Sequence, residues 1–229
     1  MLLNDIISSM FPNTCLCCHK RLLPGERHVC LRCVAAMPRP MLQGDHHDNS
    51  LARRFWATFP IEGAATAFCY TPQDTVHSII FRMKYWKPDA DLCRYAGQLI
   101  AAEDLPSRIL ADGDLLLPVP ITAARRKMRG FNQSEEICRG ICEATGLPIV
   151  TDALLRHESA KSQATTARHQ RMDNIGGFIA GDLMRLEHRH VVIIDDIITT
   201  GATVMECLHM LKDVPGIRIS IVAFGLTQR

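Results

Sequence analysis

Apolar residues recur along this chain in two patterns, strand-like runs and helical spacing, and the two patterns alternate. The strand-like runs predict strands at residues 63–70, 115–120, 148–155, 191–194 and 217–224, with another short strand after Gly177. Helical spacing predicts helices at residues 76–84, 91–103, 135–144 and 204–211. Runs that are apolar throughout, such as 191–194, are typical of a parallel sheet buried on both faces. The pattern therefore predicts an α/β domain.

The most informative stretch is residues 191–204, where a buried strand leads into two carboxylates. Asp195 and Asp196 follow the apolar run, and the sequence Thr199-Thr200-Gly201-Ala202-Thr203 leads into a helix. Hydroxyl and backbone N–H groups at a helix N-terminus suit a phosphate, whereas paired carboxylates suit sugar hydroxyls or a divalent cation. An ordinary buried strand and turn would explain 191–194, but not this crowding of polar groups where open α/β sheets bind ligands. The stretch resembles the phosphoribosyl-diphosphate (PRPP) signature of type I phosphoribosyltransferases.

A cluster of cations follows the second buried strand. The strand ends in Pro118-Val119-Pro120, and Arg125, Arg126, Lys127 and Arg129 come shortly afterwards. Cations near a strand end suit a diphosphate, and Asn132 or Ser134 can cap the helix that follows. A basic surface loop is the alternative, but this loop comes directly after a strand end, where the acidic pair would also lie.

The segment 156–174 is polar and has no clear period. Long polar segments inside a compact domain are often mobile or functional. This one could close over a bound diphosphate and exclude water.

Two C-x-x-C pairs near the N-terminus predict a metal site. Cys15 pairs with Cys18 and Cys30 with Cys33, and eleven residues separate the two pairs. This spacing fits a closed, tetrahedral Cys₄ zinc site with a structural role, and so small and polar a segment needs its metal to fold. The ligand set stays open at one point, because Cys17, His19 or His28 could replace one of the four thiolates.

Composition adds few constraints on function. The chain has 229 residues, 47% of them hydrophobic and 22% charged, with a formal net charge of +2. That balance favours no class of partner, and no apolar run is long enough to span a membrane. Residues 1–11 lack the basic start of a signal peptide, so we expect a cytoplasmic protein with reduced cysteines. Residues 38–50, rich in Pro, Gly, Asp and His, have the composition of a linker with solvated side chains.

With these motifs in order, the chain resembles the ComF/GntX family of competence-associated, phosphoribosyltransferase-like proteins. The resemblance rests on the two C-x-x-C pairs, Pro118-Val119-Pro120, Arg129-Gly130-Phe131-Asn132-Gln133, Gln163, Arg168, Arg171, Asn174, Gly177-Phe178 and Asp195-Asp196. One departure is His19, since the family more usually has glycine after the first C-x-x-C pair. The resemblance implies a type I phosphoribosyltransferase fold, with a mostly parallel sheet and flanking helices. It divides the chain into an N-terminal helix and zinc finger (1–38), a linker (39–60) and a phosphoribosyltransferase-like domain (61–229).

The resemblance also implies roles for individual residues. Asp195 and Asp196 would contact the ribose hydroxyls directly or through Mg²⁺, and the polar segment around residues 156–171 would be a mobile hood. The residues expected to bind the rest of PRPP are Val119, Pro120, Arg126, Lys127, Arg129, Arg168, Thr199, Thr200, Gly201, Ala202 and Thr203. Transfer to a nitrogen acceptor is the leading hypothesis. A PRPP-binding module without catalysis and a zinc-dependent DNA- or partner-binding protein are the alternatives.

The family context extends to DNA uptake or the use of DNA as a nutrient. Proteins of the DNA-uptake machinery and single-stranded DNA are therefore candidate partners, and a homodimer stays open. No motif in the sequence identifies the acceptor.

Overall fold

Four parallel strands form the central sheet in the computed structural model, which describes all residues except 1–12, 43, 73, 86–87, 158–176 and 228–229. Their order across the sheet is β1-β6-β5-β2. The strands are β1 (Gly63–Tyr70), β2 (Leu115–Pro118), β5 (His190–Ile198) and β6 (Arg218–Thr227). A separate antiparallel pair joins β3 (Leu154–Arg156) to β4 (Phe178–Ala180). The parallel sheet predicted from the apolar runs is confirmed.

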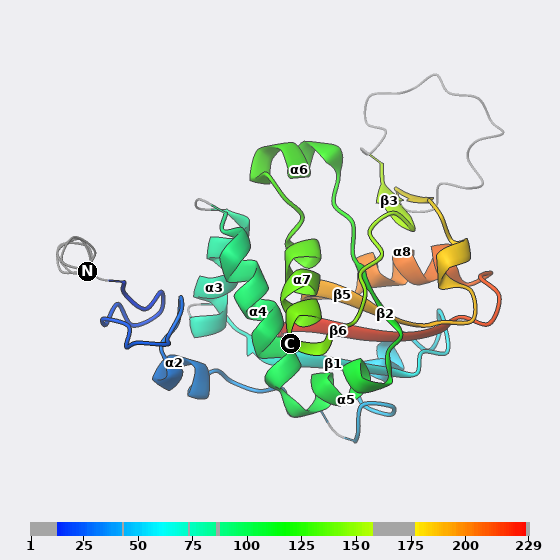
Figure 1. The fold of residues 1–229 in the computed structure, drawn as a ribbon. Coiled ribbons are helices and arrows are strands. Elements are labelled where there is room, and N and C mark those ends of the chain that lie inside the picture. The colour runs from blue at the N-terminus through cyan, green and yellow to red at the C-terminus, as the bar shows by residue number, and fades with distance from the viewer. Residues whose placement is uncertain (1–12, 43, 73, 86–87, 158–176, 228–229) are drawn as a thin grey trace.

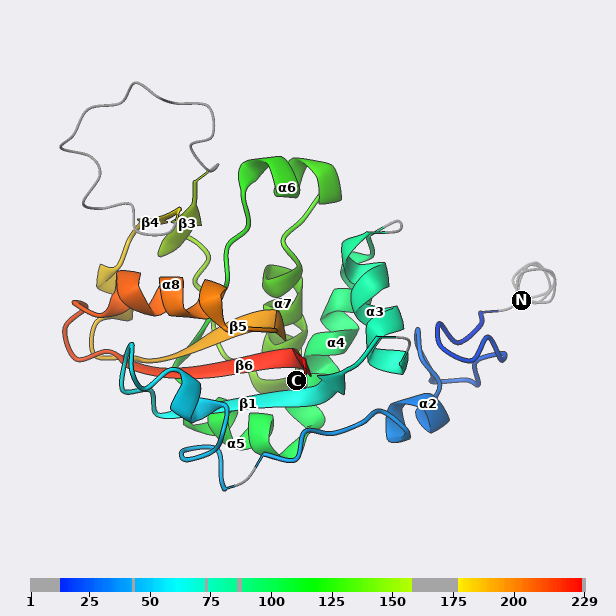
Figure 2. The ribbon, with the colours of Figure 1, turned by 180° about the vertical axis from the view of Figure 1, so that it is seen from behind.

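Helices cover both faces of this sheet, as Figures 1 and 2 show from opposite sides. Among the described residues the α-helices are α2 (Leu31–Ala35), α3 (Thr75–Lys84), α4 (Ala90–Ala102), α5 (Asp104–Asp112), α6 (Ala123–Arg129), α7 (Gln133–Thr145) and α8 (Ala202–Leu211), and η1 (Ala52–Arg54) and η3 (Met184–Leu186) are short 3₁₀ helices. Helices α3, α4, α5 and α7 pack against the face that carries Phe68, Val192 and Ile194. Helix α8, the η1 segment and the β3–β4 pair pack against the opposite face. None of the helices in the described part of the chain has the length and apolar character needed to cross a membrane.

Two buried glycines let α4 and α7 approach each other closely. A Cβ added at Gly140 of α7 would collide with the Arg94 carbonyl oxygen of α4, and one added at Gly97 would collide with the Ile137 carbonyl oxygen. An ion pair also joins these two helices, with Arg94 Nε 2.7 Å from a carboxylate oxygen of the buried Glu136. This close packing places the first turn of α7 beside the ends of β2 and β5.

The N-terminal cysteine segment packs on the main domain. Cys15, Val29 and Cys30 are buried in the same core cluster as α3 and α4. Arg27 and His28 both contact the Asp91 carboxylate on α4, at 2.7 and 2.9 Å. The small polar segment therefore shares the core of the larger domain.

Part of the predicted linker also contributes to the core. Leu51 and Phe55 are fully buried, and the buried Asn49 side chain donates to the backbone carbonyls of Asp45 (2.7 Å) and Ala64 (2.9 Å). In the same stretch His47 Nδ1 lies 2.7 Å from the Glu62 carbonyl oxygen, so this side chain has a protein partner. The division of the chain at residues 38 and 60 stays a prediction.

The observed elements differ from the predicted ones in several places. The basic loop after β2 contains a helix, α6, and α5 follows α4 without a corresponding prediction. Strand β5 continues through both carboxylates to Ile198, whereas the apolar run ends at residue 194. The strand predicted at 148–155 forms regular pairing only from Leu154 onward, with one parallel bridge between Leu116 and Ile149 before it. Most of the predicted hood lies outside the described residues.

We expect Gly140→Ala to lower the free energy of unfolding by about 2–3 kcal/mol, because the added methyl group forces two helix backbones apart. Chemical denaturation monitored by circular dichroism measures this change. Ala144→Gln at an exposed position of α7 is the control and should change stability by less than about 0.5 kcal/mol. Equal effects of the two substitutions would show that the helices are not in close contact at Gly140.

Candidate functional site

The ends of β2 and β5 bring the predicted acidic pair and the predicted diphosphate loop together. Pro118 pairs with Ile194 in parallel register, and the Val119 N–H donates to the Ile194 carbonyl at 2.9 Å. The loop that starts at Val119 and Pro120 therefore runs directly beside Asp195. These two segments are far apart in sequence and meet because parallel strands end at the same edge of the sheet.

The two carboxylates at this edge share a restricted, charged environment. Asp196 is only 7% exposed and forms an ion pair with Lys84, the last residue of α3, at 2.9 Å. Burial, and after it the neighbouring Asp196 charge, raise the pKa of Asp195 to about 7, although Lys84 and a hydrogen bond from Ser134 act in the opposite direction. Groups with such raised pKa values are typical of ligand sites.

The threonine-rich turn forms the N-terminus of α8. Gly201 has a φ of +85°, in the left-handed region, and is the N-cap residue of the helix. The Ala202 N–H donates to the Thr200 hydroxyl at 3.3 Å, and Thr199 and Thr200 are exposed. An added Cβ at Gly201 would lie 2.9 Å from the Phe55 ring, so this buried ring packs directly under the turn. The turn offers hydroxyl and N–H groups to an anion.

Three of the predicted diphosphate cations lie on α6, and two of these have protein partners. Arg126 lies 3.2 Å from a carboxylate oxygen of the buried Glu135, and Arg129 donates to the Gln133 side chain at 2.8 Å. Arg129 also lies over the ring of Tyr85, 5.9 Å from its centroid. Lys127 is exposed, and Arg168 lies outside the described residues.

A pocket of about 530 Å³ opens between the loop after β2, α6 and the β3–β4 pair. Pro118, Pro120 and Arg126 line one side of it, and Arg156 and His157 line another. It shares residues with the predicted diphosphate loop, and the acidic pair is not part of its wall.

Lys84 contacts the acidic pair and Tyr85 contacts Arg129, so both residues lie at this site. The sequence predicts no role for Lys84. The Gln133 amide donates to the Met83 carbonyl at 3.3 Å, and this bond holds the end of α3 beside the start of α7. A lysine at the end of an amphipathic helix is usually solvated, so its position gave no indication of a partner on β5.

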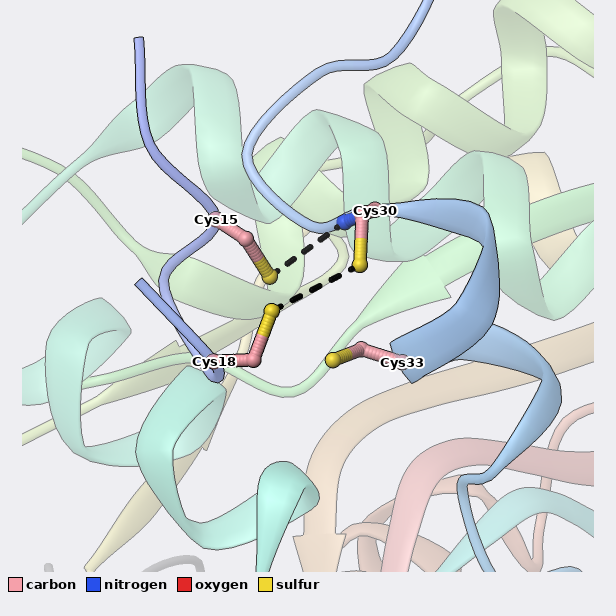
Figure 3. Close-up of side chains that lie close together, drawn as sticks. All are labelled: Cys15, Cys18, Cys30 and Cys33. Atoms are coloured by element: carbon pink, nitrogen blue, oxygen red, sulfur yellow. Dashed lines mark hydrogen bonds between the residues drawn. The ribbon is translucent and has the colours of Figure 1, made fainter. Parts of the chain in front are cut away.

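The four predicted cysteine ligands form a second site, shown in Figure 3. Their sulfur atoms all lie within 4.8 Å of one another, and the Sγ atoms of Cys18 and Cys30 are 3.8 Å apart. A tetrahedron with metal–sulfur bonds of about 2.3 Å has sulfur atoms about 3.8 Å apart. The residues Cys15, Cys18, Cys30 and Cys33 could therefore hold a metal ion.

The alternative ligands have other partners or other positions. The Cys17 thiol lies 3.9 Å from the Thr75 carbonyl oxygen, and burial raises its pKa to about 12. His28 Nε2 contacts Asp91, and His19 is not part of the sulfur cluster. His19 has a φ of 58°, the left-handed conformation that a glycine would adopt without strain.

Backbone N–H groups stabilise a thiolate at Cys15. Burial alone would raise its pKa, but N–H groups around Cys17, Cys18 and Cys30 outweigh this and lower the pKa to about 6. The Cys17 and Cys30 N–H groups both lie 3.4 Å from its sulfur atom. A preformed thiolate suits metal coordination.

Comparison with known proteins gives relatives over most of the chain, although no family model matches it. The DNA utilization proteins YhgH of Shigella flexneri and Escherichia coli K12 are each 25% identical over 210 residues, covering 87% of this chain and 91% of the relative. Competence protein F of Haemophilus influenzae is 25% identical over 101 residues, 43% of this chain and 44% of that protein. The chain is related to the ComF-like proteins. The family resemblance predicted from the sequence motifs is confirmed.

Solved structures similar to part of this chain include a PRPP amidotransferase and a hypoxanthine phosphoribosyltransferase. Glutamine PRPP amidotransferase from B. subtilis, complexed with ADP and GMP, gives a TM-score of 0.42 at 17% identity, covering 57% of this chain and 25% of that chain. Hypoxanthine phosphoribosyltransferase from Trypanosoma cruzi gives a TM-score of 0.36 at 15% identity, covering 58% and 67% of the two chains.

We expect Cys18→Ser to lose a bound metal ion and Cys17→Ser to keep it, because only Cys18 belongs to the sulfur cluster. Elemental analysis of the purified variants measures metal per chain. Cys18→Ser should also lower the melting temperature, since a closed site stabilises the segment around it. Metal loss in both variants, or in neither, would contradict this ligand set.

Proposed function

We propose that this chain binds PRPP with Mg²⁺ at the carboxyl edge of its sheet. The observation that carries the proposal is that three groups of residues with complementary chemistry lie together at this edge. These are the acidic pair on β5, the threonine-rich turn before α8 and the loop after β2. The first suits sugar hydroxyls and a divalent cation, and the other two suit phosphate groups.

Each part of the ligand has a matching group of residues in this proposal. Asp195 and Asp196 bind the ribose 2′- and 3′-hydroxyls, and carboxylate oxygens of this kind also fit the preferences of Mg²⁺. Thr199 to Thr203 wrap the 5′-phosphate. The diphosphate lies against Val119 and Pro120, with Arg126, Lys127, Arg129 and Arg168 as its cations. Arg126 would exchange Glu135 for a diphosphate oxygen, which is the stronger acceptor.

The corresponding reaction is transfer of the phosphoribosyl group to a nitrogen acceptor. The C1–oxygen bond to diphosphate breaks with its electron pair leaving on diphosphate, and the acceptor nitrogen forms the new bond to C1. Bound Mg²⁺ would supply positive charge for the departing diphosphate. The protein contributes fixed cations around diphosphate and carboxylates near the ribose. The pocket beside Pro118 and Pro120, which Arg126 also lines, offers space for the diphosphate.

We also propose that the metal in the cysteine cluster is zinc and that its role is structural. Four thiolates close the coordination shell and leave no position for a substrate. The cluster attaches the N-terminal segment to α3 and α4. The names of the ComF-like relatives support a role in competence or DNA utilisation, and contact with DNA-uptake proteins and a homodimer stay predictions.

We expect Asp195→Asn combined with Asp196→Asn to lower PRPP affinity at least about a hundredfold, because two charge-assisted contacts to the ligand are lost. Calorimetry with PRPP and Mg²⁺ measures the affinity, and circular dichroism checks that the variant is folded. Glu187→Gln combined with Asp213→Asn, at two exposed positions, is the charge-matched control and should leave affinity unchanged. Unchanged affinity in the double variant would refute the site assignment.

A second candidate function is binding of single-stranded DNA, favoured by one feature of the surface. A row of rings runs along α3: His77 and Phe81 are 6.0 Å apart, and Phe81 and Tyr85 are 5.5 Å apart. Phe81 is 43% and Tyr85 63% exposed, and Arg129 connects the row to the basic α6, which stands apart from the sheet in Figures 1 and 2. Aromatic rings beside cations suit stacked bases and a phosphate backbone. Binding of single-stranded DNA would not require any reaction of PRPP.

We expect Phe81→Ala to weaken binding of a fluorescent oligothymidylate about tenfold, since one stacking contact is worth about 1–3 kcal/mol. Fluorescence anisotropy at low salt measures the affinity, which should fall steeply as salt is added. Met184→Ala, at an apolar residue that is 77% exposed on η3, is the control. Absence of oligonucleotide binding at low salt would exclude this second function.

A further inference from the structure

The ion pair between Lys84 and Asp196 places the lysine ammonium group on a carboxylate that the proposed site uses to bind its ligand. The Lys84 Nζ atom lies 2.9 Å from Asp196 Oδ1, and the two side chains are only 17% and 10% exposed. Water and salt screen such a pair less than a surface pair. An ammonium group at this distance takes a carboxylate position that a divalent cation would otherwise use at about 2.0–2.1 Å.

The backbone on both sides of Lys84 is anchored by contacts of its neighbours. The Gln133 amide holds the Met83 carbonyl, and Arg129 lies over the Tyr85 ring on the other side of the lysine. The Cα atom of Lys84 is therefore held close to the acidic pair. Its flexible four-carbon side chain can move the ammonium group away from the carboxylate when a better cation arrives.

We propose that Lys84 is a positioning residue that holds Asp196 in the ligand-free site and competes with a divalent cation for it. The lysine neutralises one of the two carboxylates, so the free site binds a divalent cation weakly. A cation that arrives with the diphosphate brings additional contacts and displaces the ammonium group. This inference rests on the proposed function, because it assigns Lys84 a role in the same site.

The experiment titrates Mn²⁺ alone, as a probe for Mg²⁺, into the full-length protein and follows binding by electron paramagnetic resonance. We expect Lys84→Met to bind Mn²⁺ about tenfold more tightly than the unsubstituted protein, because an internal positive charge next to the site is removed. Lys84→Arg keeps the charge and should bind Mn²⁺ as weakly as the unsubstituted protein. Lys212→Met removes an exposed lysine and is the control.

Two further variants test the proposal if Lys84→Met does not fold, and test whether the gain in Mn²⁺ affinity depends on Asp196. Lys84→Gln keeps a hydrogen-bond donor without the charge, and should also bind Mn²⁺ more tightly if Lys84→Met does not fold. Adding Asp196→Asn to Lys84→Met should abolish the gain. Unchanged or weaker Mn²⁺ binding in the folded neutral variants would overturn the proposal.

The role of Lys84 can fail independently of the proposed function. Mn²⁺ binding is measured without PRPP, so the lysine result stands whether or not PRPP binds. Failure of the unsubstituted protein to bind PRPP with Mg²⁺ would overturn the proposed function and leave the Mn²⁺ comparison valid. Normal PRPP binding with unchanged Mn²⁺ affinity in Lys84→Met would overturn only the role of the lysine.

Discussion

Two adjacent carboxylates at the buried edge of a parallel sheet impose the main constraint on the surrounding structure. A buried carboxylate needs a hydrogen-bond donor or a cation, because desolvation otherwise makes its charge very costly. Asp196 obtains Lys84 from α3, and Asp195 obtains the Ser134 hydroxyl from the start of α7. The positions of two helices are thus linked to the charge at the end of one strand.

The close packing of α4 against α7 makes this arrangement possible. Gly97 and Gly140 let the two backbones touch, which brings the first turn of α7 to the ends of β2 and β5. That turn is unusually rich in buried polar side chains: Asn132 donates to the Val119 carbonyl at 3.0 Å, and Gln133 donates to the Met83 carbonyl. One helix start therefore fixes both the loop after β2 and the end of α3.

Sequence patterns were informative wherever a local signal determined the structure. The apolar run at 191–194 predicted a buried strand, and the two C-x-x-C pairs predicted a sulfur cluster that the structure assembles. Contacts made by tertiary packing left no such signal. Nothing local indicates that Phe55, in a stretch with linker composition, packs under Gly201, or that Lys84 reaches Asp196. The basic run after β2 read as a loop because its helix, α6, buries no side chain and so lacks an apolar period.

The cysteine segment and the ligand site lie at opposite ends of the same helix. The Cys17 thiol contacts the carbonyl of Thr75, the first residue of α3, and Lys84 is the last residue of that helix. Arg27 and His28 attach the segment to Asp91 at the start of α4, which packs beside α3 and α7. A metal bound by the four cysteines would therefore stabilise the segment that packs on the N-terminal ends of α3 and α4, at the far end of α3 from Lys84.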